Sequence, residues 1–262
     1  MPGSLIGRLK TGYELRWLLA TVGCTLAVLI LSHLPQDPTP EALRAGRIYL
    51  AHVLPGSAVV LAGMVWLHTL AGPFEFTVGG ALDHVGSEHD GTLLIIFGLL
   101  VTGFAVKAAL VPFHGWLPAA MVAPAPVSAL LHAVAVVKAG AFGIVRIIYD
   151  VFGSERAHAL GGTAALAIAA AVTIIYGSLQ ALRQDALKRR LAYSTVSQLS
   201  YIVIGVSLFG PLATVGGVVH LVHQGIMKIT LFFAAGNFAE TLGLHRVSEL
   251  NGVGRRMPWT LG

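Results

Sequence analysis

Long apolar runs separated by short polar segments dominate the chain. Seven of the runs approach the roughly 20 residues that a helix needs to cross a bilayer. They cover residues 17–34, 47–71, 92–111, 127–151, 164–182, 196–209 and 213–239, the sixth being the shortest. Strand-type alternation of apolar and polar positions is absent, which favours helices over a membrane barrel. The pattern predicts an all-α bundle of about seven transmembrane helices, forming a single membrane domain over residues 1–262.

The segment VPFHGWLPAAMVAPAP interrupts this pattern between the third and fourth runs. It is apolar, yet it contains Pro112, Pro118, Pro124 and Pro126, which oppose a continuous helix. Irregular backbone at membrane depth is tolerated only where protein or water surrounds it. The segment is therefore either a loop at the membrane interface or a broken, re-entrant element beside Lys107.

The composition agrees with a membrane protein. The chain is 55% hydrophobic and only 11% charged, against roughly 25% charged in soluble domains, and its mean hydropathy is +0.77. The lone cysteine, Cys24, excludes an internal disulfide and thiolate-based metal or iron–sulfur centres within the chain. No Gly-rich nucleotide motif is present. We therefore predict a multi-pass protein whose main partner is the lipid bilayer, with no cofactor and no catalytic redox site of its own.

The net charge of +5 comes from residues that lie mostly between the apolar runs. No basic stripe with interleaved aromatics exists, so no nucleic-acid partner is predicted. The segment 73–90 is acidic, whereas 183–190, the C-terminal tail and Arg44 with Arg47 are basic. Since basic loops stay cytoplasmic, we predict an inner or plasma membrane protein with its C-terminus inside and its N-terminus outside. Arg8, Lys10 and Arg16 disagree with that orientation at the first span, which we interpret as a retained span rather than a cleaved signal.

Lys107, Lys138 and Lys228 lie inside apolar runs that contain no acidic residue. A charged amine at membrane depth is costly and usually marks an ion or proton path. Lys107 is close to the end of its run, so its side chain could instead reach the interface. A buried ammonium also needs a paired anion or loses its proton. The counter-charges must come from other segments or partner subunits, or the lysines are neutral at rest.

The fourth run, PVSALLHAVAVVKAGAFGIVR, holds two of the candidate residues. On one continuous helix His132 and Lys138 are separated by about 240° of rotation and face different directions. His132 is a candidate relay, because imidazole exchanges a proton near neutral pH. The alternative is a neutral core histidine bonded to a neighbouring helix. Arg146 is near the end of the run, and we expect it to reach the interface.

A polar stripe marks the last apolar run, in HLVHQGIMK. His220, Gln224 and Lys228 recur at every fourth position and therefore share one face of a helix. Such a stripe is expected to line a hydrated seam rather than lipid. His223 lies on a neighbouring face. His220 and His223 have the spacing of two metal ligands, but no third ligand follows, so no metal site is predicted.

These motifs resemble one family. The run KAALVPFHGWLPAAMVAPAPVSALLHAVAVVKAGAFGIVRI, followed by DALKRRLAYSTVSQLSYIVIG and HLVHQGIMKITLFFAAGNFAE, resembles the antiporter-like subunits of respiratory complex I, membrane hydrogenases and Mrp cation/proton antiporters. The likeness covers about residues 40–260, and residues 1–39 form a divergent first span. SELNGVGRRMP and LAGPFEFTVGGAL favour the D-type protein of the Mrp antiporters.

The resemblance assigns roles to the candidate residues. It implies that a lysine at the position of Lys107 pairs with a glutamate on an earlier helix, and that His132 links it to the second half, beside Lys138. On a later broken helix, it implies a histidine, a second histidine four residues on and a lysine four further. His220 and Lys228 match, Gln224 occupies the middle position, and His223 is one place early.

The chain departs from the family pattern in two further respects. The expected glutamate would fall near Gly23 or Cys24, where neither residue can serve. Family members also contain two inverted five-helix repeats, neither of which is complete here. We therefore expect a fragment, a split subunit or a shortened homologue.

The leading hypothesis is proton or cation/proton translocation within a multi-subunit membrane complex, through Lys107, His132, Lys138, His220, Gln224 and Lys228. Protons are the expected cargo, with Na⁺ or K⁺ in a cation-coupled complex, and partner subunits would supply any NADH:quinone oxidoreductase or hydrogenase chemistry. A second hypothesis is a non-conducting structural subunit. A third is a haem-binding redox protein using membrane histidines, which an absorption spectrum would test.

Overall fold

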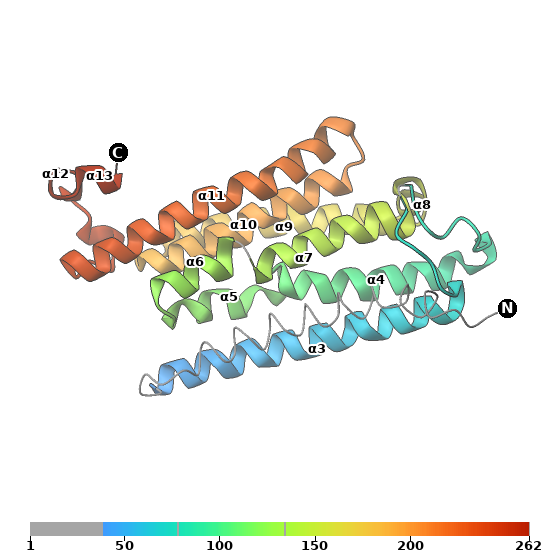
Figure 1. The fold of residues 1–262 in the computed structure, drawn as a ribbon, viewed down its shortest axis with the longest axis horizontal. Coiled ribbons are helices and arrows are strands. Elements are labelled where there is room, and N and C mark those ends of the chain that lie inside the picture. The colour runs from blue at the N-terminus through green and yellow to red at the C-terminus, as the bar shows by residue number, and fades with distance from the viewer. Residues whose placement is uncertain (1–38, 78, 134, 262) are drawn as a thin grey trace, which may run out of the picture.

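The structure is a computed structural model that describes residues 39–77, 79–133 and 135–261. Its helices lie alongside one another in an elongated bundle (Figure 1). The α-helices are α3 (Pro40–Ala71), α4 (Asp90–Lys107), α5 (Trp116–Ala119), α6 (Ala125–Ala133), α7 (Val136–Arg146), α8 (Ser154–Ala159), α9 (Gly162–Arg183), α10 (Leu187–Ser207), α11 (Pro211–Leu242), α12 (Val253–Arg256) and α13 (Pro258–Leu261). The 3-10 turns are η1 (Ser87–His89), η2 (Phe113–Gly115), η3 (Ala120–Val122) and η5 (Val247–Glu249), and a π-helix, η4 (Ile147–Phe152), extends α7.

Five helical segments of the described part are long and apolar enough to cross a membrane: Pro40–Ala71, Ser87–Lys107, Ala125–Phe152, Gly162–Arg183 and Pro211–Leu242. They correspond to five of the seven predicted runs and confirm the all-α, multi-pass architecture. The predicted span 17–34 lies outside the described residues. Within the described ranges, only the sixth run departs from the predicted set.

The predicted boundaries of that sixth run, 196–209, were wrong. The segment belongs to α10, a 21-residue helix that begins at Leu187. The helix packs against α9, α11 and α7 and buries hydroxyl groups that bond to carbonyls one turn back, as Thr195 does to Leu191 at 2.9 Å and Ser200 to Val196 at 3.0 Å. A helix covered by protein can be less apolar than one facing lipid, so the apolar run understated its length.

The two longest helices, α3 and α11, have clear start and stop signals. Each contains 32 residues, begins with proline in its first turn and ends at a glycine with positive φ, Gly72 at 70° and Gly243 at 67°. Proline suits the first turn because its missing N–H is not needed there, and glycine adopts the left-handed region without strain. At 1.5 Å per residue each helix is about 48 Å long, longer than a bilayer core of about 30 Å.

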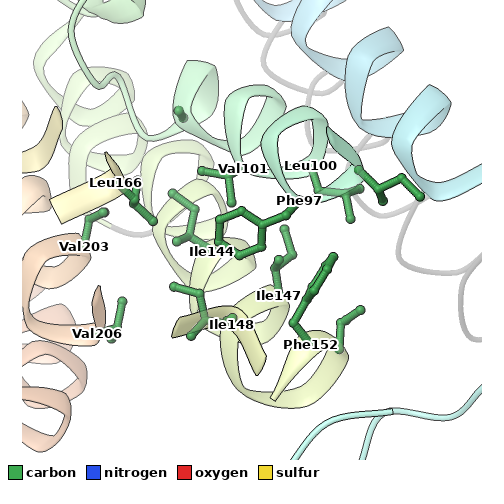
Figure 2. Packing of buried hydrophobic residues seen from close by; sticks show 14 of the residues in the cluster. Phe97, Leu100, Val101, Ile144, Ile147, Ile148, Phe152, Leu166, Val203 and Val206 are labelled. Atoms are coloured by element: carbon green, nitrogen blue, oxygen red, sulfur yellow. The ribbon is translucent and has the colours of Figure 1, made fainter. Parts of the chain in front are cut away.

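An apolar core joins four helices at the end of the bundle near α8. Phe97 of α4 packs edge-to-face on Phe152 of η4, with ring centroids 5.2 Å apart, and both rings are buried. Ile144, Leu166 and Val203 bring α7, α9 and α10 into the same cluster (Figure 2). This cluster fixes the helices on either side of the π-helix.

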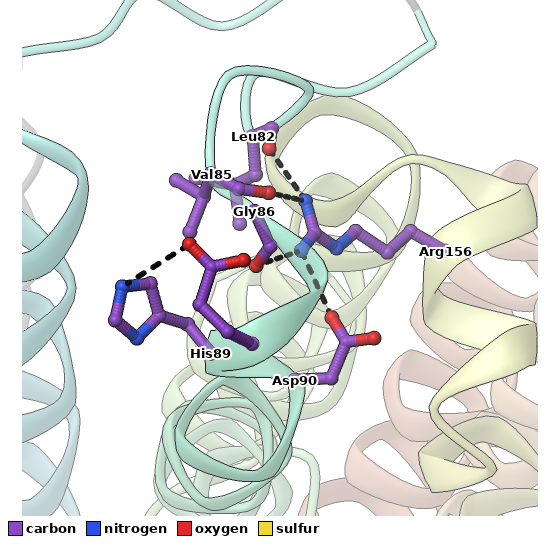
Figure 3. A network of polar contacts seen from close by, with 7 residues as sticks. Leu82, Val85, Gly86, His89, Asp90 and Arg156 are labelled. Atoms are coloured by element: carbon purple, nitrogen blue, oxygen red, sulfur yellow. Dashed lines mark hydrogen bonds and ion pairs between the residues drawn. The ribbon is translucent and has the colours of Figure 1, made fainter.

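Arg156 of α8 holds the acidic segment 73–90 against the bundle. Its guanidinium donates to the carbonyls of Leu82 at 2.6 Å and Val85 at 2.8 Å, and it pairs with Asp90 at 2.9 Å (Figure 3). A third carbonyl, that of Gly86, is 3.3 Å away. One arginine therefore donates hydrogen bonds both to the carbonyls of the loop and to the side chain of the first residue of α4.

A short backbone pairing closes the opposite end. Leu187 N–H donates to His245 O at 2.9 Å, and Val247 N–H donates to Asp185 O at 2.8 Å. Ser248 donates from its backbone and its hydroxyl to the Asp185 carboxylate, which holds the pKa of that carboxyl below its usual range. The tail after α11 is thereby tied to the turn between α9 and α10.

Candidate functional site

The fourth predicted run is a broken helix. The described α6 ends at Ala133 and α7 begins at Val136, so His132 closes one helix and Lys138 opens the next. The prediction that both residues share one continuous helix was therefore wrong. No proline or glycine marks the break in AVAVV, and for that reason the sequence pattern did not reveal it. Ala135, at φ −93° and ψ −86°, leaves the helical region there.

His132 lies between α6 and α11. Its side chain is fully buried and stacks on Phe232 of α11, with centroids 4.7 Å apart and planes 30° apart. Neither ring nitrogen has a hydrogen-bond partner among the residues that the structure describes. Lys228 is close enough for its charge to act on the ring. The alternative of a core histidine bonded to a neighbouring helix receives no support from these contacts.

Lys138 reaches across to α11. Its ammonium group donates to the carbonyl of Leu221 and lies where a Cβ on Gly225 would be. Because Gly225 has no side chain, α11 leaves room for the amine beside its own backbone. The lysine thus bridges the start of α7 and the middle of α11.

Lys228 points from α11 toward α10. Only 2% of the residue is exposed, and its ammonium group donates to Leu191 O at 3.2 Å and to the hydroxyl of Ser194. Sequence reasoning missed Ser194, although the hydroxyl-rich stretch YSTVSQLS was a visible signal. The lysine is therefore solvated by neutral acceptors of α10.

The predicted stripe on the last run is partly inside the protein. Gln224 is fully buried, whereas His220 is half-buried, with its ring centroid 6.2 Å from that of Tyr201. His220 lines a cavity of about 390 Å³ between α10 and α11, together with Gln198, Tyr201, Gly205, Ala213, Gly216 and Gly217. The resemblance implied a broken helix here, but α11 is continuous from Pro211 to Leu242, and that expectation was wrong.

Lys107 is the last residue of α4 and is 4% exposed. The alternative that it reaches the interface was therefore wrong. Gly140 of α7 lies so close that a Cβ there would be 2.7 Å from the carbonyl carbon of Lys107. The close approach of the two helices encloses the lysine.

The proline-rich segment packs inside the protein beside Lys107. It forms the short turns η2, α5 and η3, in which Trp116, Leu117 and Pro118 are buried. The Trp116 indole N–H donates to Val106 O at 2.8 Å. Of the two interpretations offered by the sequence, the structure agrees with a broken element rather than an interfacial loop.

Arg146 does not simply extend to the interface. It pairs with Asp150 at 2.8 Å and lies over the ring of Phe76 at 4.8 Å. Across the described ranges, the ion pairs are Arg146–Asp150, Arg156–Asp90 and His89–Glu88. None of these pairs includes Lys138 or Lys228, whose ammonium groups use carbonyl and hydroxyl oxygens instead. The same part of the chain contains no group of three or more residues able to hold a metal ion.

Unbonded polar atoms follow the seam between α11 and its neighbours. They belong to His132, to both amide atoms of Gln224 and to Nε2 of His220, counting only partners within the described structure. Leaving a buried polar group unbonded costs about 1–3 kcal/mol, and internal water commonly satisfies such groups. These atoms are therefore candidates for binding internal water beside titratable side chains.

These features define a polytopic membrane protein with buried lysines and an imidazole around a broken helix. Over residues 15–261 the chain matches the family described as "NADH:quinone oxidoreductase/Mrp antiporter, TM". The chain belongs to that family, which confirms the resemblance drawn from its motifs.

Individual relatives agree with the assignment. The chain is 40% identical over 219 residues to NADH-quinone oxidoreductase subunit N of Desulforudis audaxviator (strain MP104C), covering 81% of this chain and 43% of that one. It is 33% identical over 264 residues to the probable A/B component of a K(+)/H(+) antiporter of Rhizobium meliloti (strain 1021), covering 98% and 25%. A chain of the membrane-bound sulfane sulfur reductase, an archaeal respiratory membrane complex, superposes with a TM-score of 0.77 at 28% identity, covering 92% and 49%. The chain thus spans less than half the length of these relatives.

Proposed function

We propose that this chain moves protons across a membrane as an antiporter-like subunit of a multi-subunit complex. The observation that carries the proposal is the set of amines inside the bundle, buried Lys107 and Lys228 and half-buried Lys138, together with buried His132 and nearby unbonded polar atoms. Amines enclosed by apolar helices are rare without a transport role. Family membership supports the same conclusion.

In the proposed mechanism, a proton passes between neighbouring stations through water. Lys228 acts on His132 through its charge, so protonation of one disfavours protonation of the other. His220 lies near enough to Lys138 for the same repulsion, and Gln224 holds water between them. A positive charge on one side chain thereby favours release of the proton from the neighbouring side chain.

The complex, the driving force and the location are part of the proposal. We propose that partner subunits couple proton movement to Na⁺ or K⁺ flux or to electron transfer, because the relatives include components of an antiporter and of a quinone oxidoreductase. The complex would reside in the inner or plasma membrane. A non-conducting structural subunit is the alternative, with the same fold and partners.

Measurement of proton flux through the assembled complex in sealed vesicles distinguishes a proton-transporting subunit from a structural one. Lys228→Met and Lys107→Met keep the side-chain length but remove the charge, and we expect each to reduce flux at least about tenfold, since removing a proton-transfer group commonly costs 10²–10⁴-fold. The control is Arg255→Gln at an exposed position of α12. Wild-type flux in both lysine variants, in an intact complex, would identify a structural subunit.

A further inference from the structure

A second group of titratable side chains lies beside the proline-rich segment, apart from the contacts of Lys138 and Lys228. At its centre is His114 in η2. Three helices contribute the others: His52 on α3, Tyr176 on α9 and Tyr193 on α10. None of them belongs to the proton stations of the proposed mechanism.

His114 is held by an aromatic hydroxyl. Its Nε2 is 3.2 Å from the Tyr176 hydroxyl, and the two rings meet edge-to-face at 4.8 Å. The Tyr193 ring is 6.3 Å away. Nδ1 is buried without a hydrogen-bond partner of normal geometry in the described ranges, although the Pro112 backbone is close enough to interact with the ring.

A second imidazole lies next to the first. The Nε2 of His52 is 3.8 Å from where a Cβ on Gly115, the residue after His114, would be. The Nδ1 of His52 is 2.8 Å from Ile48 O, and a carbonyl only accepts, so Nδ1 carries the proton and Nε2 is left as the acceptor. The two rings can therefore exchange a proton with water between them.

The cluster lies between the basic end of the molecule and Lys107. Tyr176 and Tyr193 are each within about 10 Å of the α9–α10 turn, at 1.5 Å per residue. Lys188, in the first turn of α10, donates to Ala123 O at 3.0 Å, so the proline-rich segment lies at that end of α10. Trp116 joins the same segment to the last turn of α4, where Lys107 lies.

A purely structural role would be to anchor the broken segment. That role explains the Tyr176 contact but leaves Nδ1 buried without a hydrogen bond of normal geometry, whereas a histidine kept for structure normally has both nitrogens satisfied. A water molecule arriving from the basic end would satisfy Nδ1. Imidazole is also the side chain best suited to take and release a proton near neutral pH.

We propose that His114, with Tyr176 bonded to it and His52 beside it, is the proton-loading site that feeds Lys107 from the basic, cytoplasmic end. The inference rests on the proposed function and deepens it. A proton binds at Nδ1 from water, and the proton on Nε2 leaves through the Tyr176 oxygen and water toward Lys107. One proton enters and one leaves, so the ring is neutral again with its proton on Nδ1, and proton exchange with water restores the Nε2 tautomer before the next transfer.

The test measures initial proton uptake by the assembled complex in sealed vesicles between about pH 5 and pH 8, the range in which histidine titrates. His114→Gln preserves hydrogen bonding but cannot carry the proton, and we expect at least an about tenfold loss and a flattened pH profile. Tyr176→Phe removes only the hydroxyl, and we expect a smaller loss with a shifted pH profile, because water can take the place of the hydroxyl in the exit route. His68→Gln, an exposed histidine on the same helix as His52, is the matched control.

Parallel measurements on Lys107→Met keep the two proposals distinguishable. Flux lost in Lys107→Met but unchanged in rate and pH profile in His114→Gln overturns the loading site and leaves the proposed function standing. Flux unchanged in both overturns the proposed function as well. If His114→Gln does not assemble, Tyr176→Phe decides: an altered pH profile supports the loading site, and a wild-type profile overturns it.

Discussion

At the scale of single residues, Lys138 and Lys228 donate to neutral oxygen atoms. Lys228 donates to a carbonyl and a hydroxyl, and Lys138 donates to a carbonyl. A hydrogen bond to a charged group contributes about 1.5–3 kcal/mol, much less than the cost of an isolated charge at membrane depth. Each amine can therefore lose its proton without breaking an ion pair, as a transfer station must.

Gly225 gives a residue-scale prediction about Lys138. A methyl group at this position would occupy the place of the Lys138 amine and lie 3.1 Å from the Ala133 carbonyl oxygen. Gly225→Ala should therefore displace the amine from Leu221 O, while the Ala133 carbonyl needs to move by only a few tenths of an ångström. We expect the proposed proton flux to fall about tenfold, as for loss of a proton-transfer group. The measurement is flux in vesicles containing the assembled complex.

The matched control is Gly98→Ala on the exposed face of α4, where a Cβ would meet nothing within 4 Å. It should transport like wild type. Equal flux in the two variants would show that the position of the Lys138 amine is unimportant.

Sequence reasoning predicted the burial of the candidate residues better than their contacts. Fourfold spacing correctly placed Gln224 and Lys228 on a buried face of one helix. Ser194 and Phe232 were missed, because their roles depend on which helices meet, and spacing along one helix carries no information about that. The functional roles of the site residues remain predictions.

At the scale of elements, length and hydropathy were enough to predict the lipid-facing helices. They failed where protein replaces lipid. The predicted span covered only part of the polar, buried α10. The break between α6 and α7 was missed because apolar residues continue through it. Helix–helix contact, unlike lipid contact, is favoured by small residues, which hydropathy ignores.

One such contact gives the element-scale prediction. A Cβ on Gly103 of α4 would lie 2.7 Å from the Gly56 carbonyl of α3. Because both groups belong to helix backbones, Gly103→Val must push the helices apart, and overpacking of this kind costs about 1–3 kcal/mol. We expect a lower thermal unfolding midpoint in detergent. Gly98→Val, on the exposed face of the same helix with nothing within 4 Å, should retain the wild-type midpoint; equal losses would indicate helix propensity instead.

At the scale of the whole molecule, the distribution of charged residues and the path of the chain indicate the same orientation in the membrane. The acidic segment 73–90 and α8 lie at one end of the bundle, while the α9–α10 turn and the tail after α11 lie at the other (Figure 1). The basic residues Arg189, Arg190 and Arg246 are at the second end. That end is therefore predicted to be cytoplasmic, as the charge pattern alone indicated.

The orientation also depends on whether α10 crosses the membrane. Between the acidic segment and the tail run α4, the α6–α7 pair, α9, α10 and α11. If α10 crosses, the number of crossings is odd and the two ends face opposite sides. If α10 does not cross, the number is even and they face the same side. With 21 residues α10 is about 31 Å long, enough to cross.

Cysteine labelling tests this directly, because Cys24 is the sole cysteine and can be replaced by alanine first. Asp83→Cys, exposed in the acidic segment, should react with a membrane-impermeant maleimide in intact cells. Arg255→Cys, exposed in the tail, should react only after permeabilisation. The reversed labelling pattern would mean that the protein has the opposite orientation in the membrane. Reaction of both cysteines, or of neither, in intact cells would mean that α10 lies buried without crossing the membrane. The basic end could then not be assigned to the cytoplasm, nor could the side from which protons reach Lys107.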